Sequence, residues 1–233
     1  MREVYGKKVC ESLDEVLNPD WSALLIVDMQ NDAVKPNGKI PAAGNDVTKI
    51  AETVPRCQAL LAEARQQGVL VVHIRVLTLR DGRSDSPSWI RTKGAIVNES
   101  EFFLEDTWGA EFIEELKPRP GELIVTKHRS SAFVGTDLDM ILHAGGIATT
   151  VVIGEQTPGC VEATYRDAAY HDYYNVLAED CVAAFDQAQH EASLLIQRAR
   201  HDVCSSEDII RIWRQARSAG SRAGEPVVAG VRT

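Results

Sequence analysis

Short apolar runs alternate with amphipathic stretches along most of this chain. Residues Ser22 to Asp28, SALLIVD, form a continuous apolar run that is typical of a parallel strand covered on both faces. This run ends in a carboxylate. The pattern predicts strands at 22–28, 69–76, 122–127, 149–153 and 174–178, and the start of a short sixth strand at Val203.

Helical spacing separates these runs. Residues Asp46 to Gln67 show apolar positions at helical intervals, with Gly68 as the stop and Pro55 as a predicted kink or restart. Further helices are predicted at 108–116, 137–143, 160–172, 187–200 and 206–216, with Ser205 or Ser206 as the cap of the last one. Strands joined by single helices predict a three-layer α/β/α fold, a mainly parallel sheet of about six strands with helices on both faces.

The same pattern divides the chain into an arm, a domain and a tail. Residues 1–20 are polar and weakly patterned, 21–217 form one domain, and 218–233 are predicted to be a flexible tail. A polar, irregular stretch covers 77–107. A loop of this length inside a compact domain is usually functional, and a lid over a pocket is one possible use that the sequence leaves open.

Composition excludes several classes of protein. The chain has 233 residues, a net charge of -9 and no cluster of basic residues, so nucleic acid is not expected as a partner. No apolar run approaches the length of a membrane span and the first residues lack the apolar core of a signal peptide, so we expect a cytoplasmic protein that does not bind a membrane. The five scattered cysteines are expected to be reduced thiols.

Three reactive side chains lie at or just beyond predicted strand ends: Asp28, Lys127 and Cys160. The carboxyl ends of parallel strands meet at one edge of a sheet, where ligands of such folds bind. Cys160 follows a polar turn after Gly154 and opens a predicted helix, a position that favours a thiolate with a pKa of roughly 3.5 to 7.5. The alternative is that Cys160 is only a small buried residue.

Three stretches carry a resemblance to a known family. They are LLIVDMQND at Leu24 to Asp32, VTKHRSSAFVGTDLDMIL at Val125 to Leu142, and GEQTPGCVEATYRDA at Gly154 to Ala168. In this order and spacing they resemble the signature stretches of the isochorismatase-like cysteine hydrolases. The resemblance covers roughly residues 20 to 215.

The resemblance implies a site and a chemistry. Cys160 would be the nucleophile, Asp28 the general base and acid, and Lys127 the third catalytic member, while the backbone N–H groups of Gln156 and Cys160 would form an oxyanion hole. These residue types suit the chemistry on their own account, because a carboxylate near a thiol can take its proton and an ammonium stabilises both anions. Family members that cleave a vinyl ether lack this cysteine, so an amidohydrolase acting on linear C–N bonds is expected.

Substrate and cofactor follow less directly. Glu155, Gln156 and Thr157 offer a polar wall that favours a small ureido or carbamoyl substrate, as in relatives that hydrolyse ureidoacrylate, N-carbamoylsarcosine, biuret or triuret. Phe133 and Trp108 are equally interpretable as pocket lining or as core. Between Gln30 and Ala64 the chain has no Asp-x-His cluster like that of the metal-containing nicotinamidases, so neither metal nor cofactor is expected. A nicotinamidase-like or maleamate-type amidase, and a catalytically silent binding or scaffold protein of the same fold, are the alternatives.

Two further expectations come from the resemblance. Relatives assemble as homodimers or homotetramers, so the same is expected here. Relatives also turn the chain before the oxyanion hole through a cis bond, which predicts a cis peptide between Glu155 and Gln156.

Overall fold

The computed structural model describes residues 1–94 and 102–219 of the chain. Six strands form one sheet, in the order β5-β4-β3-β6-β7-β8, and every neighbouring pair is parallel. The strands are β3 (Ser22–Val27), β4 (Leu70–Val76), β5 (Leu123–Lys127), β6 (Thr149–Glu155), β7 (Tyr174–Ala183) and β8 (Asp202–Cys204). The predicted six-stranded parallel sheet is therefore confirmed.

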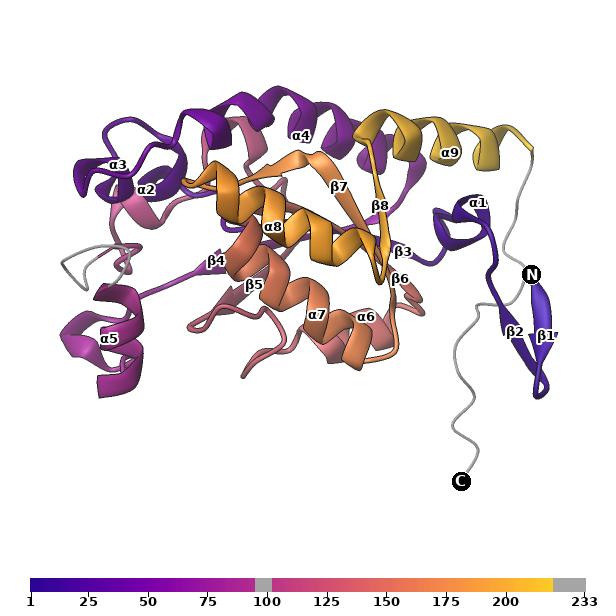
Figure 1. Ribbon diagram of the computed structural model, residues 1–233, viewed down its shortest axis with the longest axis horizontal. Helices are drawn as coiled ribbons and strands as arrows, with labels where there is room; N and C mark the ends of the chain where they lie inside the picture. The colour runs from indigo at the N-terminus through magenta and orange to yellow at the C-terminus, as the bar shows by residue number, and fades with distance from the viewer. Residues whose placement is uncertain (95–101, 220–233) are drawn as a thin grey trace.

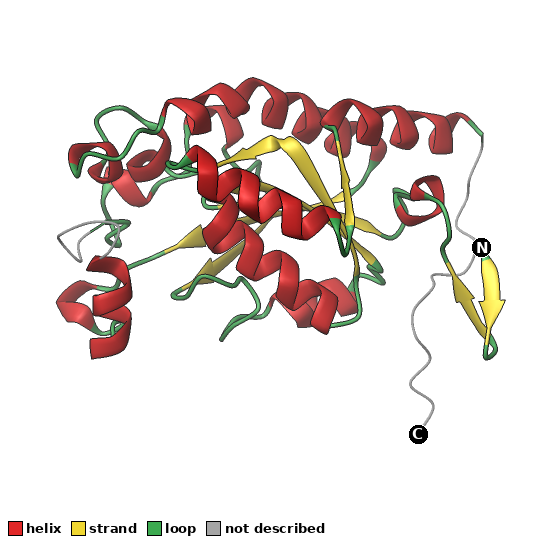
Figure 2. Ribbon diagram, viewed as in Figure 1, coloured by secondary structure: helices red, strands yellow, loops and turns green. Residues whose placement is uncertain are grey.

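Helices cover both faces of the sheet (Figures 1 and 2). One layer holds α4 (Thr48–Gln67) and α9 (Ser206–Ser218), and the other holds α6 (Leu138–Ala144), α7 (Glu162–Tyr170) and α8 (Gln187–Arg198). Short helices are α1 (Leu13–Val16), α2 (Asn31–Val34), α3 (Lys39–Ala42), α5 (Pro87–Gly94), and the single turns η1 (Arg80–Gly82), η2 (Trp108–Ala110), η3 (Glu114–Leu116) and η4 (Thr157–Val161).

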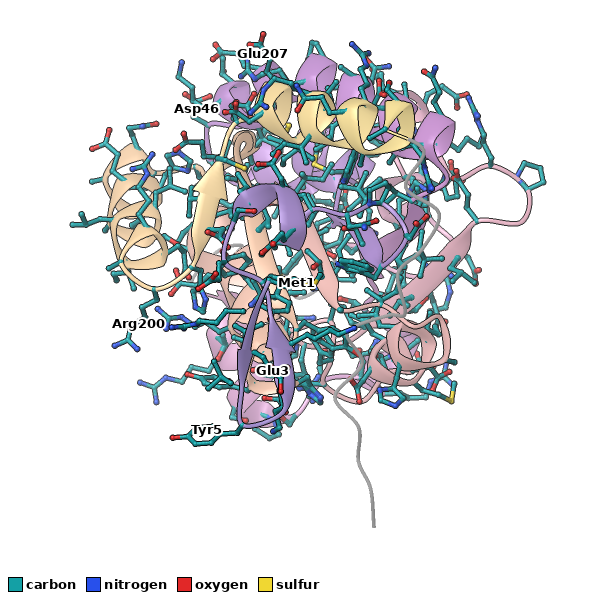
Figure 3. The ribbon with its side chains drawn as sticks, turned by 90° about the vertical axis from the view of Figure 1, so that its right-hand side faces the viewer. Met1, Glu3, Tyr5, Asp46, Arg200 and Glu207 are labelled. Atoms are coloured by element: carbon teal, nitrogen blue, oxygen red, sulfur yellow. The ribbon has the colours of Figure 1, made fainter. Side chains whose placement is uncertain are left out.

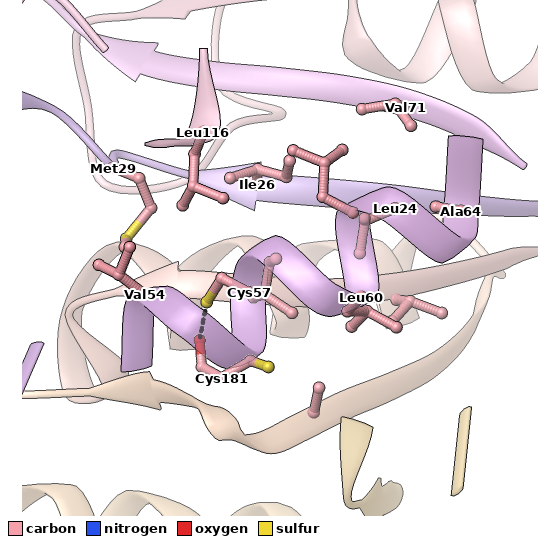
Figure 4. Packing of buried hydrophobic residues seen from close by; sticks show 14 of the residues in the cluster. Leu24, Ile26, Met29, Val54, Cys57, Leu60, Ala64, Val71, Leu116 and Cys181 are labelled. Atoms are coloured by element: carbon pink, nitrogen blue, oxygen red, sulfur yellow. Dashed lines mark hydrogen bonds between the residues drawn. The ribbon is translucent and has the colours of Figure 1, made fainter. Parts of the chain in front are cut away.

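The apolar run of β3 explains the two layers. Successive side chains of a strand point to opposite faces, so Leu24 and Ile26 pack on the α4 side while Leu25 and Val27 pack on the α7 side. All six residues of β3 are buried. Figure 4 shows Leu24 and Ile26 against the α4 residues Leu60 and Ala64. A strand buried on both faces therefore reads as a continuous apolar run rather than as an alternating one.

Several element predictions need correction. The helix α4 continues through Pro55 without a restart. The predicted helix at 108–116 is two separate turns, η2 and η3, and the stretch 77–107 contains the helix α5. Ser205 is the cap of α9, since its Oγ accepts a hydrogen bond from the N–H of Asp208 at 3.1 Å.

The N-terminal arm has regular structure of its own. Strands β1 (Arg2–Val4) and β2 (Lys7–Val9) form an antiparallel hairpin, and Tyr5 at its tip is 99% exposed (Figure 3). Most of the predicted tail, 220–233, lies outside the described residues. Among the described residues, no helix combines the length and the apolar character that crossing a membrane requires.

Candidate active site

The three reactive side chains predicted at strand ends are held by three different strands. Asp28 follows β3 directly and has a φ of 52°, a left-handed conformation that aspartate tolerates better than most residues. Its backbone N–H donates to the carbonyl of Ile74 at 3.0 Å, which fixes it to β4. Lys127 is the last residue of β5, and Cys160 lies in the turn η4 after β6.

The ammonium of Lys127 joins these side chains. Its Nζ lies 2.8 Å from Oδ2 of Asp28, 3.2 Å from Sγ of Cys160 and 3.1 Å from the carbonyl oxygen of Arg129. Lys127 is fully buried and Asp28 is 1% exposed. The structure thus brings the predicted acid, cation and thiol into direct contact at the carboxyl edge of the sheet.

Close packing between β3 and β6 places Cys160 over this edge. Gly154 lies opposite Val27 in the register and has a φ of 119°. A Cβ atom there would lie 2.1 Å from the carbonyl oxygen of Val27, so only glycine fits. The bond between Glu155 and Gln156 is cis, as predicted. The chain then turns through η4, where Gly159 departs from helical geometry with φ −116° and ψ −109°.

Burial controls the charges of the site. It raises the pKa of the Cys160 thiol, an effect that Lys127 opposes and Asp28 reinforces. It also raises the pKa of Asp28 against the pull of Lys127. For Lys127, burial alone would lower the pKa, but the charges of Asp28 and Cys160 raise it above its ordinary value. The ammonium therefore stays charged while the thiol holds its proton.

This result corrects the expectation of a thiolate stabilised by a helix N-terminus. The regular helix α7 begins at Glu162, two residues after Cys160, and the intervening turn is irregular. Cys160 therefore does not lie in the first turn of the regular helix α7. The groups that act on the thiol are the side chains of Asp28 and Lys127 rather than a helix N-terminus.

A cavity of about 80 Å³ opens onto two of the three side chains, those of Asp28 and Cys160. Glu155 and Gln156, the predicted substrate contacts, line it together with Asp28 and Cys160. The other lining residues are Ile40, Val76, Leu77, Thr78, Trp89, Thr92, Lys93, Phe102, Phe103, Arg129, Ser130 and Phe185. A cavity this small fits a small molecule rather than a peptide.

Phe133 and Trp108 lie elsewhere. The Phe133 ring is buried and stacks on His171 with ring centroids 4.8 Å apart, so it belongs to the core. Trp108 is 45% exposed and lines a wider hollow of about 900 Å³ beside Ile124 on β5. Neither residue lines the cavity next to Cys160.

Polar residues after Asp28 hold the walls of the cavity, a role that the sequence did not assign. The Gln30 side chain donates to the carbonyls of Val76 and Ala110 and accepts from the N–H of Val76. The carboxylate of Asp32 accepts from the N–H of Phe103 at 2.7 Å. The sequence signal for this role was the group of polar residues at the end of LLIVDMQND, directly after the buried strand.

Arg129 and the helix α5 form a second wall that sequence reasoning missed. Arg129 donates to the carbonyl of Ser84 at 2.9 Å, and its guanidinium lies over the Trp89 ring, 5.1 Å from the ring centroid. Lys93 pairs with Asp85. The cavity is therefore lined by cations as well as by aromatic rings.

The described residues contain no group of three or more histidine, cysteine, aspartate or glutamate side chains arranged to hold a metal ion. His73, inside β4, instead binds Glu122 at 2.9 Å. The expected independence from metal stays a prediction. All five cysteines are free.

Comparison with known proteins agrees with this geometry. The sequence model of the isochorismatase domain family matches residues 22–208 of this chain. Ureidoacrylate amidohydrolase RutB of Variovorax paradoxus (strain S110) is 34% identical over 174 residues, which cover 70% of this chain and 69% of the relative.

Solved structures give the same result. A cysteine hydrolase from Pseudomonas syringae pv. phaseolicola 1448A has a TM-score of 0.76 and 28% identity, covering 85% of this chain and 95% of the other. N-carbamoylsarcosine amidase from Thermoplasma acidophilum has a TM-score of 0.64 and 30% identity, covering 80% and 96%.

The fold and the site define a three-layer α/β/α protein with a cysteine, a carboxylate and an ammonium at one sheet edge. The chain belongs to the isochorismatase family and is a hydrolase.

Proposed function

We propose that this chain is a cysteine-dependent amidohydrolase that cleaves a C–N bond of a small amide, ureido or carbamoyl compound. The observation that carries the proposal is the buried ammonium of Lys127, in contact with both Asp28 and Cys160. A thiol, a base and a fixed cation within contact distance are the groups that nucleophilic attack on a carbonyl requires.

The first half of the reaction forms a thioester. Sγ of Cys160 attacks the carbonyl carbon while its proton passes to Asp28, and Lys127 stabilises the developing negative charge. The N–H groups of Gln156 and Cys160 hold the oxyanion. The C–N bond then breaks, and the departing nitrogen takes the proton from Asp28, leaving as ammonia or an amine.

The second half releases the acid. Asp28, again ionised, takes a proton from a water molecule that attacks the thioester carbonyl, and the C–S bond breaks. The thiolate of Cys160 recovers the proton from Asp28, which restores the starting state. Burial raises the pKa of both Asp28 and Cys160, so each can take up a proton and release it again. The carboxyl of Asp28 can therefore serve both halves of the reaction.

The substrate class is inferred from the relatives and the cavity. The names of both relatives, ureidoacrylate amidohydrolase and N-carbamoylsarcosine amidase, denote a substrate with a ureido or carbamoyl group. The cavity is small and offers Glu155 and Gln156 as polar lining. A small ureido or carbamoyl compound is therefore proposed ahead of a nicotinamide-type or maleamate-type amide.

Ammonia release from a panel of amides and ureides tests the proposal. The unchanged protein should act on at least one ureido or carbamoyl compound, and Cys160→Ala should lower kcat by about 10⁴-fold or more with the fold intact. Cys204→Ala, which changes a thiol away from the site, is the matched control. Substantial turnover by Cys160→Ala would exclude the covalent mechanism.

Labelling of thiols separates an enzyme from a silent scaffold of the same fold. Iodoacetamide should modify Cys160 faster than the other four cysteines, because Lys127 contacts its sulfur and stabilises the thiolate, and Asp28 can take the thiol proton. Five equally slow thiols, together with an inactive panel, would favour the scaffold.

We also infer a homodimer or homotetramer from the family. Light scattering of the purified chain tests this assembly, and a monomer would refute it.

A further inference from the structure

Glu155 is a buried carboxyl group that the proposed reaction does not use. It is the last residue of β6 and is 5% exposed. Its side chain lines the cavity that also holds Cys160 and Asp28. Among residues 1–94 and 102–219, no protein group makes a hydrogen bond or an ion pair with its carboxyl. The group is thus available to whatever enters the cavity.

Among residues 1–94 and 102–219, no cation forms an ion pair with Glu155. From β5, Lys127 binds Asp28 and Cys160 instead. From the opposite wall, Lys93 pairs with Asp85, and it also donates to Thr78. The cations around the cavity are thus engaged elsewhere.

Arg129 is the other cation that lines the cavity. Its guanidinium donates to two backbone carbonyls, those of Ser84 and His128, and lies over the Trp89 ring. No ion pair joins it to Glu155 in the described part of the chain.

The surroundings favour the neutral form of this carboxyl. Burial raises the pKa of Glu155 well above its ordinary value, and the nearby charge of Asp28 raises it further, while Lys127 opposes both. The thiol of Cys160, on η4, is the remaining titratable group that faces the same space, and it holds its proton. These surroundings favour a carboxylic acid over a second carboxylate in the cavity.

A carboxylic acid presents one O–H donor and one carbonyl acceptor side by side. A carbamoyl group, H₂N–C=O, presents the complementary acceptor and donor at the same spacing. The two form a pair of parallel hydrogen bonds. A carboxylate lacks the donor, and an apolar side chain lacks both.

We propose that Glu155 is a specificity-determining residue that binds a second carbamoyl or amide group of the substrate, next to the scissile carbonyl. The substrate class is then a small diamide or carbamoylurea with two such groups. This inference rests on the proposed amidohydrolase function and adds which part of the substrate is recognised, and by which side chain.

Biuret and N-acetylurea provide a matched pair of probes. They differ by replacement of one NH₂ with CH₃, so biuret keeps the second carbamoyl group and N-acetylurea does not. We expect the unchanged protein to favour biuret in kcat/KM by about tenfold, the worth of the one hydrogen bond that the missing NH₂ group can no longer donate. The preference should decline as the pH rises and Glu155 ionises, because the O–H donor is lost.

Variants then separate the neutral acid from the other interpretations. Glu155→Gln replaces the acid by an amide, which has the same donor and acceptor, and should keep the preference while losing its dependence on pH. Glu155→Leu should abolish the preference, through KM rather than kcat. Glu207→Gln, on the exposed first turn of α9, is the control for loss of a carboxylate (Figure 3).

Three results would overturn the inference. The first is a preference for biuret that persists in Glu155→Leu. The second is a loss of the preference in Glu155→Gln that is as complete as in Glu155→Leu. The third is an unchanged protein that hydrolyses other amides but shows no preference for biuret. If Glu155→Leu does not fold, Glu155→Met serves in its place, with the rate of Cys160 alkylation as a check of the site. Failure of the proposed function itself is distinct, because the unchanged protein would then hydrolyse no compound of the panel.

Discussion

Lys127 explains how a carboxylate and a thiol share a buried site. An ammonium with no exposure is costly unless it is paired, and here Asp28 and Cys160 both contact it. The pairing keeps Lys127 charged. It also opposes the rise that burial causes in the pKa of Cys160.

Removing this charge should therefore make the thiol harder to ionise. In Lys127→Ala the pKa of Cys160 should rise, so the rate of alkylation by iodoacetamide should reach half its maximum at a higher pH than in the unchanged protein. Lys117→Ala removes an exposed lysine and is the control. An alkylation profile that does not move in Lys127→Ala would contradict the contact between Nζ and Sγ.

At this scale the sequence predicted which residues meet but not how they are charged. Asp28 and Lys127 end strands, and strand ends of a parallel sheet converge, so their meeting follows from the pattern. The charge state of Cys160 depends on burial by segments far away in the chain, such as α5, and on the irregular turn at Gly159. No local pattern carries that information.

At the scale of the elements, the site depends on the close packing of β6 against β3 at Gly154. Gly154→Ala would place a methyl group 2.1 Å from the carbonyl oxygen of Val27, in a backbone conformation with φ 119°. We expect a loss of about 4 kcal/mol in the free energy of unfolding, since neither strand can move away within the sheet. Urea denaturation measures it.

Gly121→Ala is the matched control for this substitution. Gly121 also has a positive φ, 91°, but no atom lies within 4 Å of the added Cβ. Only the conformational cost applies there, about 1 kcal/mol. Equal losses in the two variants would show that the contact with Val27 is not limiting.

A polar cluster joins α4, β4 and the start of β5. Arg65 binds Glu122 through Nε at 2.7 Å and Nη2 at 2.8 Å, and the buried His73 binds the same carboxylate at 2.9 Å. Burial alone would raise the pKa of Glu122, but the bonds from Arg65, the N–H of Arg119 and His73 lower it to about 2.

A lowered carboxyl pKa stabilises the fold at high pH and not at low pH. The contribution of Glu122 is complete above its unfolded value of 4.5 and is lost as the pH falls toward about 2. Glu122→Gln should therefore lower the free energy of unfolding by about 2 kcal/mol at pH 7, and by progressively less below pH 4.5. Urea titrations across this range test it, with the exposed Glu52→Gln as control. A difference that is independent of pH would refute the pairing.

Elements with long patterns were predicted well, and short ones were not. The strands β3 and β6 are buried on both faces, and their sequences, SALLIV and TTVVIGE, each contain a continuous apolar stretch. Turns such as η2 and η3 contain three residues each, which is too few to show a helical period, so their region was interpreted as one helix. The polar helix α5 has one buried residue, Lys93, and gave no apolar stripe.

For the molecule as a whole, the alternation of strands and helices determined the layers, and the family resemblance located the site within them. The contribution of α5 and of 102–103 to the cavity wall could not be predicted, because it depends on polar anchors such as Asp32 that hold distant backbone. The hairpin β1–β2 was also missed, since its short strands are largely exposed and lack an apolar side.

Dependence on metal is a property of the whole molecule, and we expect it to separate this chain from the metal-containing amidases of its family. A bound cation would stabilise an oxyanion or a thiolate, and here the ammonium of Lys127 already contacts the sulfur and stays charged. The described residues also bring no three metal-ligating side chains together. We therefore expect that prolonged dialysis against a strong chelator leaves kcat/KM for the best substrate of the amide and ureide panel unchanged, and that added Zn²⁺ does not raise it. Metal content measured on the same sample distinguishes a protein without metal from one that merely retains it. Activity that falls on dialysis and returns with one metal ion would show that a metal site exists, and that Lys127 does not replace it.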